Sequence, residues 1–280
     1  MMCAASWGCE PGGAAPASHP AHLRRVREVR LAALWALVGM VVGSLLSLLV
    51  HRLPRMEKLA APVYCPHCHV RRPIYAQSAL LLLLLGARGR CGGCGAYPDR
   101  LALVVEVSTA GAFWLLFLRF GPSQALLLTS LYASFLIVVF FIDWQHRLIP
   151  NRVTYPGVIV GILLTPALSP VTLRMALLGV LVGAGAFGLL YGGGYLVYRQ
   201  EVLGMGDVKL AAMLGAMVGF PAIVLALLLG SFVGAVSAAV MLLTRRGSGH
   251  EYMPYGTSMC LGAFASFFAD AYSLVGFSIP

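Results

Sequence analysis

The chain has 280 residues, of which 59% are hydrophobic and only 11% charged, and its formal net charge is +10. A soluble domain carries roughly 25% charged residues, so this composition excludes a cytosolic globular enzyme, a disordered protein and a secreted disulfide scaffold. It predicts a polytopic membrane protein, in which each spanning helix takes ~20 apolar residues. In such a protein basic residues mark cytoplasmic loops and anionic lipid head groups, so we expect membrane lipid and no nucleic acid as a partner.

Apolar runs bounded by Pro, Gly or charge predict an all-α membrane bundle of about eight transmembrane helices. The runs are 31–50, 103–120, 123–142, 153–168, 175–197, 207–219, 221–243 and 257–277. The run 207–219 is less than ~20 Å long at 1.5 Å per residue. We therefore expect this helix either to tilt little or to begin inside the hydrocarbon.

Four regions follow from these runs. Residues 1–30 are expected to form a disordered tail, 31–50 the first membrane helix, 51–102 a cytoplasmic loop module and 103–280 a seven-helix membrane domain. With eight spans, 14 of the 20 Lys and Arg residues fall on the side that holds the loop module. The positive-inside rule places that side in the cytoplasm, although four arginines of the tail lie on the other side.

The loop module contains two C-x-x-C pairs, formed by Cys65 and Cys68 and by Cys91 and Cys94. About fifty residues need a metal or disulfides to hold a fold, and two such pairs complete a tetrahedral, structural zinc site of four thiolates. Two disulfides are the alternative, which reducing conditions in the cytoplasm disfavour. The neighbouring His67 and His69 are expected to be surface residues rather than ligands.

Two aspartates lie at helix ends that face the same side of the membrane. Asp143 closes the third apolar run and Asp207 opens the sixth, within Gly204-Met205-Gly206-Asp207. Two carboxyl groups brought together there would share one proton, which is the chemistry of an aspartic protease. Gly204 and Gly206 would allow a close backbone approach to substrate and a positive φ. The alternatives are an interfacial Asp143 paired with Arg147 and an Asp207 that merely caps its helix.

These residues resemble the bacterial type IV prepilin leader peptidases, which are membrane aspartic proteases of the G-x-G-D class. The similarity runs from about residue 43 to 265 and includes six segments in order: Gly43–Pro54, the C-x-x-C pairs, Val105-Glu106, Asp143 with Ile149-Pro150-Asn151, Gly204–Leu210 and Met253–Gly256. The resemblance implies an endopeptidase of the bacterial inner membrane, multi-pass, with its active site facing the cytoplasm. Its substrates would be prepilins or pseudopilins, cut at a basic leader, usually after glycine.

By matching position, the resemblance makes Asp143 and Asp207 the catalytic pair. Gly204, Gly206, Glu106 and Lys209 are candidates for positioning substrate. For Glu106, an interfacial glutamate at a helix start is an equal alternative; for Lys209, the alternatives are pairing with the nearby aspartate or with lipid phosphate. Asp270 is most simply an interfacial residue.

Members of the family that contain the zinc module often also methylate the new terminal amine, using S-adenosylmethionine. Two departures bear on this second activity. Ser47 stands where the family usually has Asn, and Ile74–Ser78 replaces an expected Asn-Ile-Pro segment. Peptidase activity is therefore better supported by the sequence than methylation.

Two other functions compete with the peptidase. A proton-coupled membrane transporter would use Asp143 and Asp207 as a proton relay, but it would be expected to have matching inverted halves, which the sequence lacks. A membrane anchor whose zinc module binds a partner would leave both aspartates dispensable.

Overall fold

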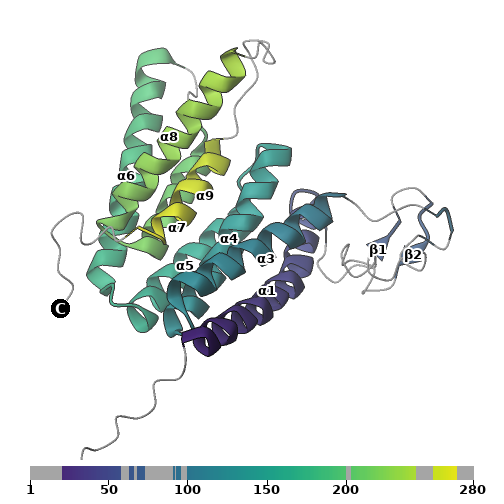
Figure 1. Cartoon of the computed structure of the whole chain (residues 1–280). Coiled ribbons are helices and arrows are strands. Elements are labelled where there is room, and N and C mark those ends of the chain that lie inside the picture. The colour runs from purple at the N-terminus through teal and green to yellow at the C-terminus, as the bar shows by residue number, and fades with distance from the viewer. Residues whose placement is uncertain are drawn as a thin grey trace, which may run out of the picture.

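The computed structural model describes residues 21–57, 63–65, 68–72, 91, 93–95, 100–199, 203–243 and 255–269. Within these ranges the protein is a bundle of eight helices with a small cysteine-containing module at one end (Figure 1). The helices are α1 (Ala21–Arg52), α3 (Arg100–Phe120), α4 (Gln124–His146), α5 (Asn151–Leu168), α6 (Leu173–Tyr198), α7 (Met205–Val218), α8 (Ala222–Leu243) and α9 (Tyr255–Ser266). The predicted all-α membrane bundle is confirmed.

Helix ends differ from the sequence expectation in three places. α1 begins at Ala21, ten residues before the predicted span, because the arginine-rich segment ahead of the apolar run consists of good helix formers. α4 continues past Asp143 to His146, so that aspartate lies inside the helix rather than at its end. α9 is only 12 residues long, where the apolar pattern predicted a span.

Close contacts between glycines and their neighbours define how the helices run relative to one another. Gly43 of α1 packs on Glu106 of α3, and Gly39 on Phe113, so these two helices are antiparallel. By contrast, α5 and α7 are parallel, because Gly157 meets Met213 and Gly161 meets Ala216.

α6 packs antiparallel on α7, and α8 packs antiparallel on α9. The backbones of Gly179 and Gly215 touch at the α6–α7 crossing, where small residues allow this approach. It follows that the ends of α1 and α4 and the starts of α3, α5, α7 and α9 share one end of the bundle.

Five helices are long and apolar enough to cross a membrane, namely α1, α3, α4, α6 and α8, among the residues searched. α7 and α9 have only 14 and 12 residues. Most of their side chains are buried, and in the view of Figure 1 the two helices lie among the longer ones. Because protein rather than lipid surrounds α7 and α9, the length of these helices does not have to match the thickness of the bilayer.

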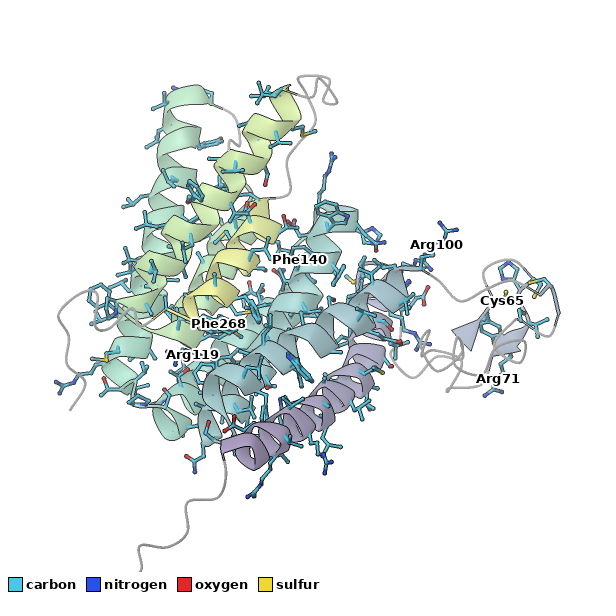
Figure 2. All side chains as sticks on the ribbon, in the orientation of Figure 1. Cys65, Arg71, Arg100, Arg119, Phe140 and Phe268 are labelled. Carbon is cyan, nitrogen blue, oxygen red and sulfur yellow. The ribbon has the colours of Figure 1, made fainter. Side chains whose placement is uncertain are left out.

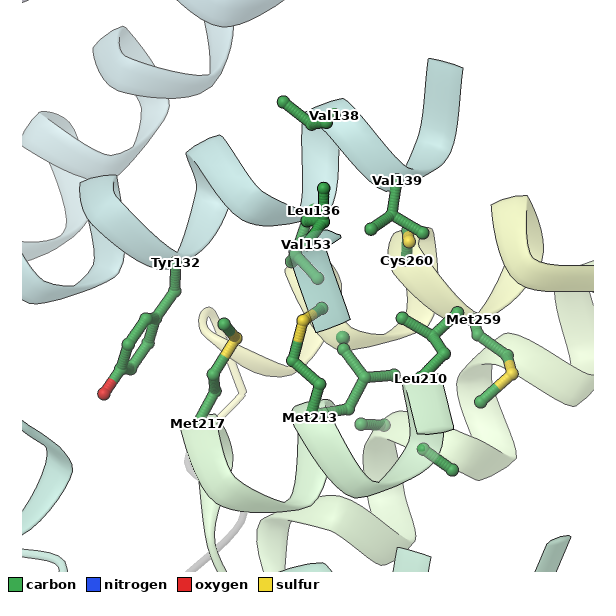
Figure 3. Close-up of a cluster of buried hydrophobic side chains, with 14 of the residues drawn as sticks. Tyr132, Leu136, Val138, Val139, Val153, Leu210, Met213, Met217, Met259 and Cys260 are labelled. Carbon is green, nitrogen blue, oxygen red and sulfur yellow. The ribbon is translucent and has the colours of Figure 1, made fainter. Parts of the chain in front are cut away.

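The main hydrophobic core joins these short helices to α4. Leu210 and Met213 of α7 belong to one buried cluster with Tyr132 and Val139 of α4 and Met259 of α9, and Leu210 lies next to Met259 in the view of Figure 3. These side chains are almost fully buried. The core therefore fixes α4, α7 and α9 against each other directly below the polar end of the bundle.

The far end of α7 is closed by a side chain of α5. Thr165 Oγ1 donates to the carbonyl of Ala216 at 3.0 Å, and Tyr132 Oη lies 2.6 Å from the same hydroxyl. The last carbonyls of a helix have no partner within it, and in a membrane interior an unpaired carbonyl is costly. This polar contact lets α7 end inside the bundle.

Candidate active site

Asp143 lies in the last two turns of α4 with its carboxylate turned into the bundle. Only 4% of the residue is exposed. Its Oδ2 accepts a hydrogen bond of 2.8 Å from the backbone N–H of Thr257, and the N–H of Gly256 also donates to it. These are first-turn amides of α9, which have no partner within their own helix. Arg147, the alternative partner, is exposed and instead caps α4 in the left-handed conformation.

Asp207 lies in the first turn of α7 and is equally buried, with 5% exposed. A backbone hydrogen bond links Gly204, which caps the helix, to the Asp207 side chain. This is the position expected from sequence. A carboxylate in the first turn is favoured by the positive end of the helix dipole.

The structure brings these two carboxyl groups together. Asp143 acts electrostatically on Asp207, and both act on the buried thiol of Cys260, one turn into α9. Ile149 lies beside both positions, since it borders Gly206 and Gly256. Two residues that are 64 positions apart in the chain thus form one buried acidic pair at the end of the bundle where α5, α7 and α9 begin.

The two glycines before Asp207 do not adopt the backbone expected for them. Gly204 has φ −72°, and neither glycine is among the described residues with positive φ. Gly206 instead packs closely on its neighbour, because a Cβ there would lie 3.1 Å from Ile149 Cβ. The prediction of positive φ is therefore wrong, and close packing of α7 on the segment after α4 is the reason for a glycine.

Lys209 is directed toward α5 and away from the acidic pair. Its Nζ donates to Oδ1 of Asn151 at 3.0 Å and lies 5.5 Å from the ring centre of Tyr155. The side chain is half-buried. Lys209 thus joins the starts of α5 and α7, a contact that neither alternative from sequence anticipated.

Glu106 belongs to a different interface, between α1 and α3. It is fully buried, and its Oε1 accepts a hydrogen bond of 3.0 Å from Ser44 Oγ. A Cβ at Gly43 would meet its Cα at 2.8 Å, so the two helices are in close contact there. Glu106 is thus an interior residue of the α1–α3 pair rather than an exposed glutamate at a helix start.

The four predicted cysteines form a second cluster, outside the bundle. Figure 2 shows Cys65 beyond Arg100, the first residue of α3. The four sulfur atoms lie within 4.8 Å of one another, with Cys65–Cys94 at 3.6 Å and Cys68–Cys91 at 3.4 Å. A tetrahedron with zinc–sulfur bonds of ~2.3 Å has edges of about 3.8 Å. All four are free cysteines, so the arrangement fits a metal ion and not the disulfide alternative.

The two C-x-x-C pairs have the same backbone hydrogen bond, and in both a residue in the left-handed conformation follows the second cysteine. The N–H of His69 donates to the carbonyl of Cys65, and the N–H of Gly95 donates to the carbonyl of Cys91. His69 and Gly95 both adopt the left-handed conformation. The first pair lies between β1 (Val63–Tyr64) and β2 (Arg71–Arg72), which pair antiparallel.

The cysteine cluster also favours the thiolate form at one of its members. The backbone N–H groups of Gly93 and Cys94 donate to the Cys91 sulfur, and with the Cys68 thiol they lower the pKa of Cys91 to about 6. A thiolate is the form that binds a metal. His69 is exposed and outside the four-sulfur cluster, as expected. His67 and Asp270 lie outside the described residues.

Sequence reasoning missed the residues that hold the acidic pair in place. The segment Met253–Gly256 was part of the family resemblance but was given no role. An apolar run after Pro and Gly is a signal for a helix start. The first N–H groups of a helix have no partner within it and can bind a carboxylate. The buried thiol of Cys260, in the same helix, was not among the predicted site residues, although it interacts electrostatically with both aspartates. The contact between Asn151 and Lys209 has no signal in the sequence.

Two family models match the chain. Residues 37–120 match the bacterial peptidase A24 N-terminal domain, and residues 130–239 match the type IV leader peptidase family. These ranges contain the cysteine cluster, Glu106 and both aspartates. No solved structure matches the chain.

Characterised relatives from several bacteria are similar over most of the chain. A prepilin leader peptidase/N-methyltransferase of Myxococcus xanthus is 35% identical over 74% of this chain and 62% of its own length. A type 4 prepilin-like proteins leader peptide-processing enzyme of Escherichia coli is 33% identical over 83% of this chain and 92% of its own length. A prepilin leader peptidase/N-methyltransferase of Aeromonas hydrophila is 30% identical, with 81% and 87% covered. The chain therefore belongs to the type IV leader peptidase family.

Proposed function

We propose that this protein is a membrane aspartic endopeptidase that removes the leader peptide of type IV prepilins or pseudopilins. The observation that carries the proposal is the buried pair formed by Asp143 and Asp207. The names of the relatives in Escherichia coli and Aeromonas hydrophila give the substrate class. A proton-coupled transporter finds no support among these relatives.

The acidic pair supplies the parts that peptide hydrolysis needs. Two neighbouring carboxyl groups in a site of low polarity hold one proton between them. The ionised member takes a proton from water, whose oxygen attacks the scissile carbonyl carbon, while the protonated member donates to the carbonyl oxygen. The carbon–nitrogen bond then breaks as the carboxyl group that took the proton from water gives it to the leaving amine, and the other carboxylate regains a proton from the diol. Gly204 and Gly206 border Asp207, where a substrate strand would lie.

The site faces the cytoplasm in this proposal. The acidic pair and the cysteine cluster share one end of the bundle, and the loops there contain most of the basic residues. A cytoplasmic location also keeps the four thiols reduced and able to bind zinc as a structural ion. The membrane would then be the bacterial inner membrane, and the basic leader of a prepilin would reach the site from the cytoplasm.

Methylation of the new terminal amine is a second activity that we propose on the names of two relatives, which are peptidase/N-methyltransferases. S-adenosylmethionine would be the methyl donor. Glu106 and Ser44 form a buried polar contact between α1 and α3, within the segment that matches the N-terminal domain. We assign the methyl-transfer role to that domain and the cleavage role to the region that contains both aspartates.

Co-expression with a prepilin that carries a Gly-Phe junction tests both activities. Mass spectrometry of the pilin amino terminus reports cleavage and the additional methyl group. We expect Asp143→Asn and Asp207→Asn each to lower cleavage by about 10³-fold or more, while Asp270→Asn, the same chemical change outside the pair, retains it. Cleavage at the normal rate in both single variants would overturn the proposal.

A further inference from the structure

Asp143 and Asp207 have similar burial but different hydrogen-bond donors. Asp143 accepts from the two backbone N–H groups of Gly256 and Thr257, which belong to another helix. Asp207 has one backbone partner, Gly204, three residues before it in its own segment. A backbone N–H that is held rigidly toward a carboxylate stabilises its ionised form.

The start of α9 is held firmly in this position. The Tyr255 hydroxyl lies 2.8 Å from Ser231 Oγ of α8, and its ring packs on Phe187 of α6. A Cβ at Gly256 would lie 2.9 Å from Asp143 Oδ2, so glycine is required for the amides to reach the carboxylate. The donors are therefore preorganised by contacts that lie outside the acidic pair.

We infer that Asp143 is the ionised member of the pair and the general base that activates water, that Gly256 and Thr257 are its positioning residues, and that Asp207 carries the shared proton. This inference rests on the proposed peptidase function. One proton moves from water to Asp143, and the proton of Asp207 moves to the carbonyl oxygen of the scissile bond. The amides of α9 keep the negative charge on Asp143 before the reaction, although the end of α4 by itself disfavours an anion there.

The charged groups near Asp143 do not account for its ionised form, so the assignment rests on the amides of α9. Within the part of the chain that the structure describes, the titratable groups of neighbouring helices that interact electrostatically with it are Asp207 of α7 and Cys260 of α9. Glu106 of α3 contacts Ser44, and Lys209 of α7 binds Asn151. Neither of these contacts supplies a cation to Asp143.

Replacing Thr257 with its α-hydroxy acid removes the amide donor and keeps both aspartates and the threonine side chain, because an ester oxygen takes the place of the N–H. Thr257 is the third residue of α9, and its N–H has no partner within the helix, so the helix itself loses no hydrogen bond. Replacing Gly256 with its α-hydroxy acid is a second variant, which removes the other amide donor without adding a side chain. Thr257→Ala is the matched control, because it retains the amide.

The measurement is the pH profile of kcat/KM of the purified full chain in detergent, with a prepilin peptide that carries a Gly-Phe junction. If Asp143 is the base, loss of the donor moves the acid limb to higher pH by roughly one to two units, the size expected for one hydrogen bond to a charged acceptor. Cleavage then recovers toward alkaline pH. Thr257→Ala keeps the wild-type acid limb.

Three results would overturn the assignment. They are an unshifted profile in both amide-free variants, a shift of the alkaline limb alone, and loss of cleavage at every pH in both variants. The second of these would identify Asp143 as the proton donor. An inactive wild-type chain would instead contradict the proposed function, so the two failures are distinguishable.

Discussion

Lys209 Nζ donates a hydrogen bond of 3.0 Å to Asn151 Oδ1, although the two residues are 58 positions apart. This contact joins the first turn of α5 to the helix that contains Asp207, two residues before Lys209. The lysine also lies over the ring of Tyr155. The partners that the sequence suggested for Lys209, an aspartate or a lipid phosphate, are replaced by a neutral amide.

We expect Lys209→Ala to lower kcat/KM for prepilin cleavage by roughly fivefold, because a partly exposed hydrogen bond contributes about 1 kcal/mol. Lys209→Arg should retain most activity, since a guanidinium group can both donate to Asn151 and stack on Tyr155. Kinetics with purified variants check this. A loss as large as that of Asp207→Asn would show that Lys209 contacts substrate directly.

Gly256→Ala should lower cleavage by about 100-fold, because the new Cβ would lie 2.9 Å from Asp143 Oδ2 and would displace the carboxylate. The matched control is Gly185→Ala in α6, where nothing lies within 4 Å of the added Cβ. Both variants should retain helical content by circular dichroism. Wild-type cleavage by Gly256→Ala would contradict the close approach of α9 to Asp143.

Thr165→Val should destabilise the bundle by about 1–3 kcal/mol, because it leaves buried carbonyls of α7 and the Tyr132 hydroxyl without their partner. Thr154→Val is the same substitution in the same helix, at a buried hydroxyl that has no hydrogen-bond partner among the described residues. That control should be neutral or stabilising. Denaturant unfolding of the two variants in detergent measures the difference, and equal effects would count against the role of Thr165 at the end of α7.

Cys65→Ser should lower the bound zinc, measured by elemental analysis of the purified chain, from about one ion to well below one. The reason is that Cys65 is a buried member of the four-sulfur cluster, and a closed zinc site needs all four ligands. Cys260→Ser removes a thiol outside the cluster and should retain the metal. Zinc content that is the same in both variants would exclude the cluster as the binding site.

The sequence by itself determined the membrane bundle, the order of its helices and the cysteine pairs. These follow from local properties: runs of apolar residues predict helices, and a C-x-x-C spacing places two sulfur atoms near one ion. Asp143 and Asp207 could also be predicted as site residues from the sequence, because ionisable residues are rare beside long apolar runs.

The tertiary structure alone decided how the aspartates differ. Which helix start would face Asp143 depends on how α9 packs between α4 and α8, and no local pattern contains that information. The same holds for Glu106, whose hydrogen-bond partner Ser44 comes from α1, and for the length of α7, which can be short because Thr165 of α5 donates to a carbonyl at its end. Local sequence fixes which groups are available; their partners depend on contacts between segments far apart in the chain.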